Sequence, residues 1–335
     1  MTVRVAMNGF GRIGRMVFRA LAESGRDDIE VVAINDLGSA EDNAHMLRFD
    51  SVHGPLNIDV AVNGDSMTVG GRTVKVLAER DPSGLPWGDL SVDIVAECTG
   101  IFSDRDKAAI HLDAGAKRVL VSAPSKGADL TVVYGVNHQK LTADHLVVSN
   151  ASCTTNCLAP VAHVLNRSFG LNHGYMTTIH AFTGDQRTVD TLHSDLRRAR
   201  AASVSMIPTS TGAARAVGEV LPELKGKLDG SAIRVPTPNV SMIDLKCVLG
   251  KNVTEDDVNG VMQEAADGDL KGVLVVNELP LVSIDFNHNP ASSTFDATQT
   301  KVLENNFLRV LSWYDNEWGF SNRMLDTLAA MGKHI

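Results

Sequence analysis

The chain has 335 residues, which exceeds the length at which one hydrophobic core usually stops growing, so two domains are expected. Hydrophobic residues make up 44% of it, and no apolar run reaches the roughly 18 residues that a membrane-spanning helix needs. We therefore expect no membrane partner, and the net charge of −9 argues against a specific nucleic-acid partner.

The four cysteines are too few for a disulfide framework in a chain of this length. The N-terminal residues enter a strand-like pattern at once and leave no room for a secretion signal. We therefore expect a cytoplasmic protein whose thiols stay reduced and are available for chemistry.

Short apolar runs alternate with helical spacing along the first half of the chain. The pattern predicts strands at Val3–Met7, Ile29–Ile34, Val92–Glu97 and Arg118–Ser122, and a helix at Ile13–Glu23. Strands that alternate with helices favour a parallel sheet that is covered on both faces.

A glycine-rich turn joins the first predicted strand to the first predicted helix. Gly9, Gly11 and Gly14 have the G-x-G-x-x-G spacing, and Asp36 ends the next apolar run 22 positions after Gly14. Gly9 would permit the tight turn, Gly11 the approach of a pyrophosphate, and Gly14 the close packing of helix on strand. Asp36 is placed to accept hydrogen bonds from a ribose, which favours NAD over NADP. An ordinary strand–helix turn is the alternative, but the context indicates an α/β, Rossmann-type doubly wound parallel sheet.

The candidate nucleophile is Cys153, which stands where cap-forming residues precede an apolar helical pattern. A thiol on the first turn of a helix faces the positive end of the helix dipole, so we expect its pKa to be lowered. His180, near the end of a predicted strand, is the candidate base. The sequence alone does not show that the two side chains meet.

The other cysteines, Cys98, Cys157 and Cys247, are interpreted as small buried apolar residues. Cys157 follows Cys153 by four positions, but no histidine or cysteine cluster supplies the further ligands of a zinc site. We therefore expect no metal.

From about Ser168 onward the predicted strands become longer, and several are polar at alternate positions. They are Tyr175–Phe182, Arg234–Val235, Ser241–Leu249, Val282–Asp285, Thr294–Asp296 and Phe307–Tyr314. This alternation predicts an α+β domain with a mostly antiparallel sheet. A last helix is expected at Gly319–Met331, where the apolar residues share one face.

The same half carries groups that suit phosphate. Arg197, Arg198 and Arg200 form one cluster, Pro208–Gly212 is rich in hydroxyl groups, and Arg234 stands alone before a proline. Guanidinium groups, hydroxyls and glycine N–H groups together make phosphate cradles. For at least one of these arginines, a solvated helical face or an interface is the simpler interpretation.

Together these motifs resemble the glyceraldehyde-3-phosphate dehydrogenase family, and the matching blocks follow one another almost from end to end. They are Asn8–Gly14, Asn35-Asp36, Val121–Ser125, Ala151–Cys157, Asp195–Arg200, Arg234–Pro238 and Ser312–Gly319. The resemblance implies an NAD-dependent, phosphorylating oxidation of glyceraldehyde 3-phosphate, a reaction of glycolysis and gluconeogenesis that uses inorganic phosphate. It also implies a homotetramer, with the segment from about Phe182 to Met206 in the interface.

The resemblance assigns residues 1–151, joined by the C-terminal helix 318–335, to an NAD-binding domain, and residues 152–317 to a catalytic domain. It makes Cys153 the nucleophile of a hemithioacetal and then a thioester, with His180 as the base. The implied cofactor contacts are Gly9, Gly11, Arg12, Ile13, Gly14, Asp36, Arg80, Ser122 and Asn316. The implied substrate and phosphate contacts are Ser152, Thr154, Thr183, Arg198, Thr211, Gly212 and Arg234.

Two positions depart from the family's usual pattern. Phe320 replaces the tyrosine of a Trp-Gly-Tyr run, so a hydroxyl near the expected nicotinamide pocket is missing. Thr191-Leu192 matches neither the Leu-Pro of strictly NAD-using members nor the Ala-Ser of dual-cofactor plastid members.

Three other functions are open at this point: an erythrose-4-phosphate dehydrogenase, a cysteine hydrolase, and a non-enzymatic NAD- or RNA-binding protein that uses Arg197–Arg200. Thr209–Gly212 argues against the first, because it suits productive binding of inorganic phosphate. A hydrolase would leave the glycine-rich turn unexplained, and the negative net charge opposes RNA binding.

Overall fold

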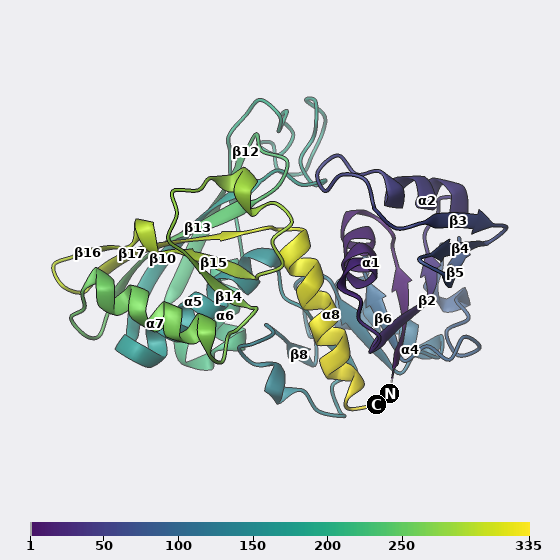
Figure 1. Ribbon diagram of the computed structural model, residues 1–335, viewed down its shortest axis with the longest axis horizontal. Coiled ribbons are helices and arrows are strands. Elements are labelled where there is room, and N and C mark those ends of the chain that lie inside the picture. The colour runs from purple at the N-terminus through teal and green to yellow at the C-terminus, as the bar shows by residue number, and fades with distance from the viewer. Residues whose placement is uncertain (1) are drawn as a thin grey trace. The chain divides into compact units, whose positions relative to one another are not determined.

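The computed structural model describes residues 2–335, which form two compact units (Figure 1). Unit 1 contains residues 2–134, 138–152 and 321–335, and unit 2 contains residues 135–137 and 153–320. Both ends of the described chain therefore belong to unit 1.

Unit 1 is built on a nine-stranded sheet in the order β3-β4-β5-β2-β1-β6-β7-β9-β8. The strands are β1 (Val3–Asn8), β2 (Ile29–Asn35), β3 (Val60–Asn63), β4 (Ser66–Val69), β5 (Arg72–Leu77), β6 (Ile94–Glu97), β7 (Arg118–Val121), β8 (Leu130–Thr131) and β9 (Val147–Ser149). The strands from β5 through β8 pair in parallel, whereas β3, β4 and β5 form an antiparallel edge. The order reverses at β1 and β6 as in a doubly wound dinucleotide-binding sheet, which confirms the predicted fold.

Two helix ends of unit 1 are marked by caps in the sequence. The helices are α1 (Arg12–Ser24), α2 (Ala40–Arg48), α3 (Arg105–Ala108), α4 (Ile110–Asp113) and most of α8 (Trp318–Gly332). α1 ends at Gly25, whose φ of 67° is the left-handed conformation that glycine adopts without strain. Ser39 and Asp42 form a capping box at the start of α2.

The last helix completes unit 1. In Figure 1 the yellow α8 lies beside the purple α1, and Arg26, just after α1, pairs with Asp326 at 2.7 Å. A side chain at Gly332 would collide with Val3, so the end of α8 packs directly against the start of β1. Met324, Leu328 and Met331 are fully buried, in agreement with the predicted apolar face.

Unit 2 contains a second sheet in the order β11-β12-β10-β13-β17-β15-β14, with β16 paired to β17. The strands are β10 (Leu171–Ala181), β11 (Ile207–Ser210), β12 (Leu228–Val235), β13 (Ser241–Leu249), β14 (Leu274–Asn277), β15 (Ser293–Asp296), β16 (Lys301–Leu303) and β17 (Phe307–Tyr314). The pairs β10–β12 and β14–β15 are parallel and the others antiparallel, so the sheet is mostly antiparallel as predicted.

Three longer helices accompany this sheet: α5 (Cys153–Phe169), α6 (Ala213–Val220) and α7 (Glu255–Asp267). α5 is almost wholly buried along its first three turns. β13 alternates between buried and part-buried positions, so one face of the sheet supports the core.

One predicted strand is wrong. Val282–Asp285 does not pair with the sheet, because the Asp285 carboxylate accepts the N–H of Val282 and the chain closes a 3-10 turn at Ser283–Phe286. The hairpin strands β3–β5 were not predicted, because they are short and mix polar with apolar residues. Within the described residues, no helix is long and apolar enough to cross a bilayer.

Candidate active site

Each of the three glycines in the turn after β1 is required, or tolerated, for a different structural reason. Gly9 has a φ of +90°, and a Cβ there would lie 2.7 Å from the backbone nitrogen of Thr99. A Cβ on Gly14 would collide with the carbonyl oxygen of Gly9. A Cβ on Gly11 would meet no atom of the protein within 4 Å. Gly9 and Gly14 are therefore required by the fold, whereas the space beside Gly11 is left open.

A cavity of about 490 Å³ opens at this turn, at the carboxyl ends of β1, β2 and β6. It is lined by Asn8, Gly9, Gly11, Asn35, Asp36, Leu37, Glu79, Arg80, Cys98, Thr99, Ile101 and Phe102. The predicted cofactor residues Gly9, Gly11, Asp36 and Arg80 meet here. Arg12, Ile13, Gly14 and Ser122 do not line it. Cys98 was expected to be a buried core residue, but it is only part-buried and contributes to the wall.

Asp36 and Arg12 are both held by the protein itself. The carboxylate of Asp36 accepts the N–H of Phe10 at 2.8 Å and that of Gly38 at 3.2 Å. The guanidinium of Arg12 pairs with Asp50 at 2.5 Å. Burial raises the pKa of Asp50, but N–H donors and Arg12 outweigh burial and hold this pKa at about 2. Asp36 thus faces the cavity in a fixed orientation, while Arg12 anchors α1.

A buried polar network supports the floor of this cavity, and the sequence did not indicate it. Glu97 accepts hydrogen bonds from Asn8 Nδ2 at 2.6 Å, from His111 Nε2 at 3.0 Å and from the Thr99 N–H at 2.7 Å. Trp87 Nε1 donates to His111 Nδ1 at 3.1 Å, so the ring proton must sit on Nε2 and point at Glu97. The carboxylate thereby fixes the loop that carries Thr99 into the cavity wall.

In unit 2 the structure brings Cys153 and His180 together. Cys153 is the first residue of α5, and His180 is the penultimate residue of β10. Their Sγ and Nε2 atoms lie 3.5 Å apart, which is within reach of a thiol hydrogen bond. His180 is only 2% exposed, and its ring meets Tyr314 edge-on at 5.8 Å.

The charge states of this pair differ from the sequence-based expectation. Burial raises the pKa of the Cys153 thiol, although Arg234 and hydrogen bonds from Thr154 act in the opposite direction. The predicted lowering of this pKa is therefore wrong, because desolvation of the thiolate outweighs the field of the helix. Burial, and then the charge of Arg234, lowers the pKa of His180 to about 3. The imidazole is consequently neutral at pH 7 and can accept a hydrogen bond from the thiol, while both shifts act against a thiolate–imidazolium pair.

Arg234 is the register partner of His180 on the neighbouring parallel strand β12. Its Nη1 lies 2.5 Å from His180 Nδ1 and 3.1 Å from the Ala181 carbonyl oxygen. The same Nδ1 is 2.7 Å from that carbonyl oxygen, and a proton on Nδ1 would be donated there and would keep Nε2 as the acceptor toward Cys153. Nη1 of Arg234 can only donate, so its contact with Nδ1 requires the other tautomer, with the proton on Nε2. The two neighbours of Nδ1 thus favour opposite tautomers of His180.

The guanidinium of Arg234 lacks an anionic partner. No carboxylate of the described residues forms an ion pair with it, and its buried Nε has no hydrogen-bond acceptor. Burial lowers the pKa of Arg234, yet an arginine this basic stays charged. A mostly buried cation with a free donor beside the Cys153–His180 pair is a site for an anion.

Three of the other predicted substrate residues, Arg198, Thr183 and Thr211, have protein partners in this structure. Arg198 donates to Thr209 Oγ1 and pairs with Asp185 at 2.8 Å. Thr183 donates to Gln186, and Thr211 accepts the N–H of Ala213 at the start of α6. Gly212 precedes α6 with open space around it, and Ser152 directly precedes Cys153.

Tyr314 and Ser241 hold other residues of the site in place through hydrogen bonds, and neither was assigned a role from the sequence. The hydroxyl of Tyr314 links Thr154 at 2.8 Å to Thr178 at 2.9 Å. Ser241 Oγ accepts the N–H of Ala181 and donates to Asn316 Oδ1 at 2.8 Å. With Oδ1 engaged, the Nδ2 of Asn316 remains the donor. Ser241 begins β13 and Tyr314 ends β17. A side chain with a hydroxyl group at the end of an apolar strand is the sequence signal that could have identified both residues.

Comparisons with known proteins agree with this arrangement. A family model described as glyceraldehyde 3-phosphate dehydrogenase, NAD binding domain, matches residues 3–105, and one described as the C-terminal domain of the same enzyme matches residues 152–316. The chain is 68% identical over 333 residues to the glyceraldehyde-3-phosphate dehydrogenase of Xanthobacter flavus and 64% identical over 333 residues to that of Cereibacter sphaeroides. It is 56% identical over 334 residues to glyceraldehyde-3-phosphate dehydrogenase 1 of Bacillus subtilis (strain 168). Each comparison covers 99% of both chains.

Proposed function

The chain belongs to the glyceraldehyde-3-phosphate dehydrogenase family, and we propose that Cys153 and His180 carry out its reaction. That reaction oxidises D-glyceraldehyde 3-phosphate with NAD and inorganic phosphate to 1,3-bisphosphoglycerate, a step of glycolysis and gluconeogenesis. The observation that carries the assignment of residues is the 3.5 Å approach of Sγ to Nε2 beside the unpaired Arg234.

The cavity of unit 1 fits the dinucleotide. The open space beside Gly11 and the positive end of the α1 dipole suit a pyrophosphate, while Asp36 suits ribose hydroxyls. A 2′-phosphate would meet the negative charge of Asp36, so NAD is preferred. When bound, NAD supplies the hydride acceptor of the oxidation. Asn316, oriented by Ser241, would offer its amide N–H to the carboxamide of the nicotinamide.

Cys153 opens the reaction. Its sulfur forms a bond to the aldehyde carbon, and its proton passes through Nε2 of His180 to the aldehyde oxygen, which gives a hemithioacetal and leaves the imidazole neutral again. His180 then takes the proton of the new hydroxyl as the carbon is oxidised, so the product on Cys153 is a thioester. A phosphate oxygen attacks the thioester carbon, the C–S bond breaks, and Cys153 leaves as thiolate to recover its proton. Water exclusion matters here, because hydrolysis would waste the thioester.

Two anion sites are needed for this sequence of steps. We assign Arg234, with Thr183, to the 3-phosphate of the substrate, because Arg234 has no carboxylate partner among the described residues and its Nε has no acceptor. Ser152, Thr154, Thr211 and Gly212 would hold the attacking phosphate. Arg198 is held by Asp185 and Thr209, so it acts at the edge of the site rather than as a free cation. Orientation of both reactants can supply roughly 7–11 kcal/mol of the barrier reduction.

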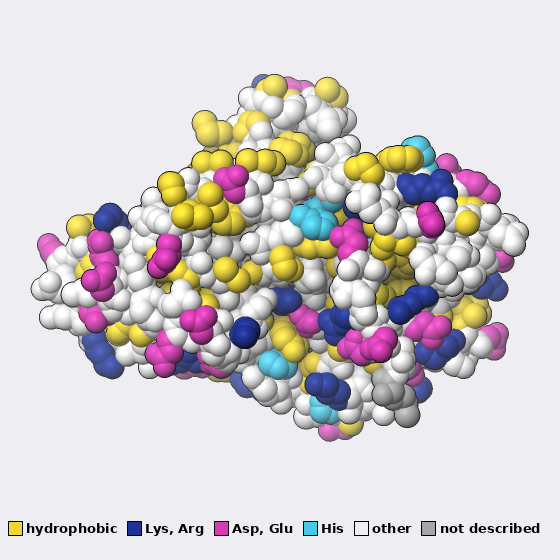
Figure 2. Space-filling model, in the orientation of Figure 1, with side chains coloured by type: hydrophobic (Ala, Val, Ile, Leu, Met, Phe, Trp, Pro, Cys, Tyr) yellow, Lys and Arg dark blue, Asp and Glu magenta, His cyan; other side chains and the backbone are white. Residues whose placement is uncertain are grey.

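We further propose the domain roles and the assembly. Residues 1–151 with 318–335 would bind NAD, and residues 152–317 would hold the chemistry. Val189, Leu192, Leu196, Val204 and Met206 are strongly exposed, with Leu192 at 88%. Hydrophobic side chains gather over this part of the surface, at the top of Figure 2. An apolar patch of this kind marks a protein interface, which supports a homotetramer with Phe182–Met206 between subunits.

A cytoplasmic location is also part of the proposal. All four cysteines are free in this structure, and the nucleophile must stay reduced to work. A reducing compartment meets that requirement.

The function is tested by the formation of NADH from glyceraldehyde 3-phosphate, with and without inorganic phosphate, and with NADP in place of NAD. We expect turnover that depends on phosphate and a clear preference for NAD. The same assay with erythrose 4-phosphate is the control for substrate. Faster turnover of erythrose 4-phosphate without a phosphate requirement would overturn the assignment, and so would hydrolysis of the substrate without NAD.

A further inference from the structure

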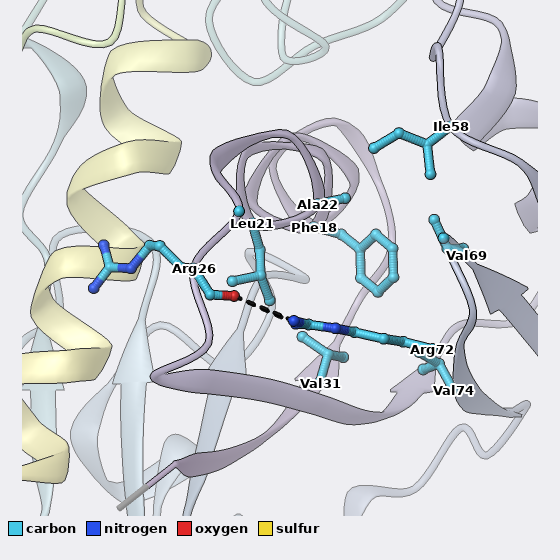
Figure 3. Close-up of a pocket in the computed structure, with 11 residues that line it drawn as sticks. Phe18, Leu21, Ala22, Arg26, Val31, Ile58, Val69, Arg72 and Val74 are labelled. Carbon is cyan, nitrogen blue, oxygen red and sulfur yellow. Dashed lines mark hydrogen bonds between the residues drawn. The ribbon is translucent and has the colours of Figure 1, made fainter.

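A second pocket lies in unit 1 and shares no residue with the cofactor cavity (Figure 3). It has a volume of about 180 Å³ and is formed by the last turns of α1 and by strands β2, β4 and β5. α1 has 13 residues and is therefore about 20 Å long, so this pocket and Gly11 stand at opposite ends of one helix. We call it the α1 pocket.

The walls of the α1 pocket are apolar. Figure 3 shows the side chains of α1 and those of the strands directed into one space. The main apolar contributors are Phe18, Leu21, Val31, Ile58, Val69 and Val74. An apolar cavity of about 150 Å³ is large enough to hold benzene, so one of this size holds a ring with a short substituent.

The charge at the pocket comes from Arg72. Figure 3 shows its side chain extending along the pocket toward Arg26, where Nη1 and Nη2 lie 3.4 and 3.5 Å from the Arg26 carbonyl oxygen. These are long, weak contacts, and Arg72 has no carboxylate partner within the described residues. The neighbouring Arg26 is neutralised by Asp28 and Asp326, both within 2.8 Å. The Arg72 guanidinium, which lies beside an apolar space, is therefore available to pair with an anionic ligand.

We propose that the α1 pocket binds a small monocarboxylic acid with a flat apolar body, of about ten non-hydrogen atoms. The ring lies among Phe18, Val31 and Val74, and the carboxylate accepts hydrogen bonds from the Arg72 guanidinium. A second carboxyl group or a longer chain would not fit the volume. This site is separate from the catalytic reaction and does not depend on the proposed function.

The test uses the NAD-loaded full chain and two probes of equal size, phenylacetate and its uncharged analogue phenylacetamide. Binding is followed by calorimetry and by the methyl NMR signals of Ile58, Val31 and Val69, which line the pocket. We expect phenylacetate to bind with a Kd of about 1 mM or less and to shift these signals. Phenylacetamide should bind about tenfold more weakly.

Three variants separate the contributions. Arg72→Gln should weaken phenylacetate about tenfold and leave phenylacetamide unchanged, because only the charged hydrogen bonds are lost. Lys75→Gln is the matched control, since Lys75 is an exposed cation on β5 whose side chain points to the opposite face. Ala22→Leu should block both probes by filling the space.

Each outcome decides the proposal. It stands if the acid binds in the presence of NAD, if Arg72→Gln alone separates the two probes, and if Ala22→Leu blocks both. It falls if phenylacetate displaces NAD, because the ligand would then occupy the cofactor cavity. It also falls if neither probe shifts the methyl signals, or if Lys75→Gln weakens phenylacetate as much as Arg72→Gln does.

Discussion

Two opposed effects act on the sulfur of Cys153. Its place at the start of α5 favours a thiolate, and that place was visible in the sequence as a cap followed by an apolar pattern. Burial raises the pKa instead, and burial depends on side chains that come from β10, β12 and β17. The position of a reactive residue at the start of a helix can thus be predicted from the neighbouring sequence. Its charge state cannot, because it depends on tertiary packing.

We expect His180→Gln to lower kcat roughly 100-fold or more, because the thiol and the hemithioacetal hydroxyl lose their proton acceptor. NAD affinity should change little. The measurement is steady-state kinetics combined with the rate at which iodoacetamide alkylates Cys153 at pH 7. Cys153→Ser, which should lack the thioester and the labelling altogether, identifies the sulfur that reacts. Wild-type alkylation in His180→Gln would contradict the assigned role.

His180 also makes a prediction for stability against pH. Its folded pKa of about 3 lies below the ordinary value of 6.5, so between these values the unfolded chain binds a proton that the folded chain refuses. The free energy of unfolding must therefore fall as the pH drops from 6.5 toward 3. In His180→Gln this loss disappears, and the slope should be shallower by up to about 1.4 kcal/mol per pH unit.

Urea unfolding at several pH values between 7 and 4.5 measures this slope. His173→Gln is the matched control, since it removes an exposed histidine from the same strand, β10. Equal slopes for the native protein and for His180→Gln would show that His180 is not held neutral by the fold.

At the scale of elements, the turn between β1 and α1 was predictable because its glycines obey a spacing rule. The structure separates their roles, since Gly14 is closed in by the Gly9 carbonyl and Gly11 faces open space. The network of Glu97, His111 and Trp87 was not predictable, because its members come from separate strands and helices and have no fixed spacing. Local patterns thus indicate where a ligand approaches, while the support beneath it depends on the three-dimensional fold.

We expect Gly11→Ala and Gly14→Ala to have contrasting effects. Gly11→Ala should keep its thermal stability but lose affinity for NAD, because its methyl group points into the space for the pyrophosphate. Gly14→Ala should lose stability, since its methyl group must push helix from strand. Melting temperatures and NAD titrations of both variants measure the contrast. Equal loss of stability in both would show that the space beside Gly11 is not reserved for a ligand.

We expect Glu97→Gln to weaken NAD binding and to lower stability. All the hydrogen-bond partners of the Glu97 carboxylate are donors, so the side-chain nitrogen of the new glutamine would face another donor. Each buried group left unsatisfied in this way costs about 1–3 kcal/mol. Glu30→Gln is the control, because it removes only an exposed pair with Arg4. The readouts are NAD titration and chemical unfolding. If Glu97→Gln behaves like Glu30→Gln in both, the network does not position the cavity wall.

At the scale of the whole molecule, the predicted combination of a parallel and a mostly antiparallel sheet is confirmed. The composition and strand patterns were sufficient for this, because each sheet type has its own alternation of apolar residues. The assignment of cofactor and catalytic domains to sequence ranges stays a prediction. The exposed leucines and valines of Phe182–Met206 could not be read as exposed from sequence, since a leucine is more often buried.

The assembly is tested by placing a charge in the apolar segment. We expect Leu192→Glu to weaken the association of subunits, because a carboxylate would be desolvated in the interface. Leu303→Glu is the control, as Leu303 is exposed on β16 outside the segment. Sedimentation over a range of concentrations measures the oligomer. A native protein that stays monomeric at high concentration would contradict the proposed tetramer.

The return of α8 to unit 1 has a consequence for the order in which the protein forms on the ribosome. Unit 2 is nearly continuous, and its residues have all been made once Phe320 is added. Unit 1 begins with the first strand but closes only with residues 321–335, which bring Asp326 to Arg26 and pack Gly332 against Val3. The nascent chain must therefore carry an unfinished unit 1, with its sheet lacking the cover of α8, until residues 321–335 have been made, against the usual tendency of N-terminal domains to fold first. During synthesis, the apolar surface that α8 later covers is therefore exposed while the whole of unit 2 is being made.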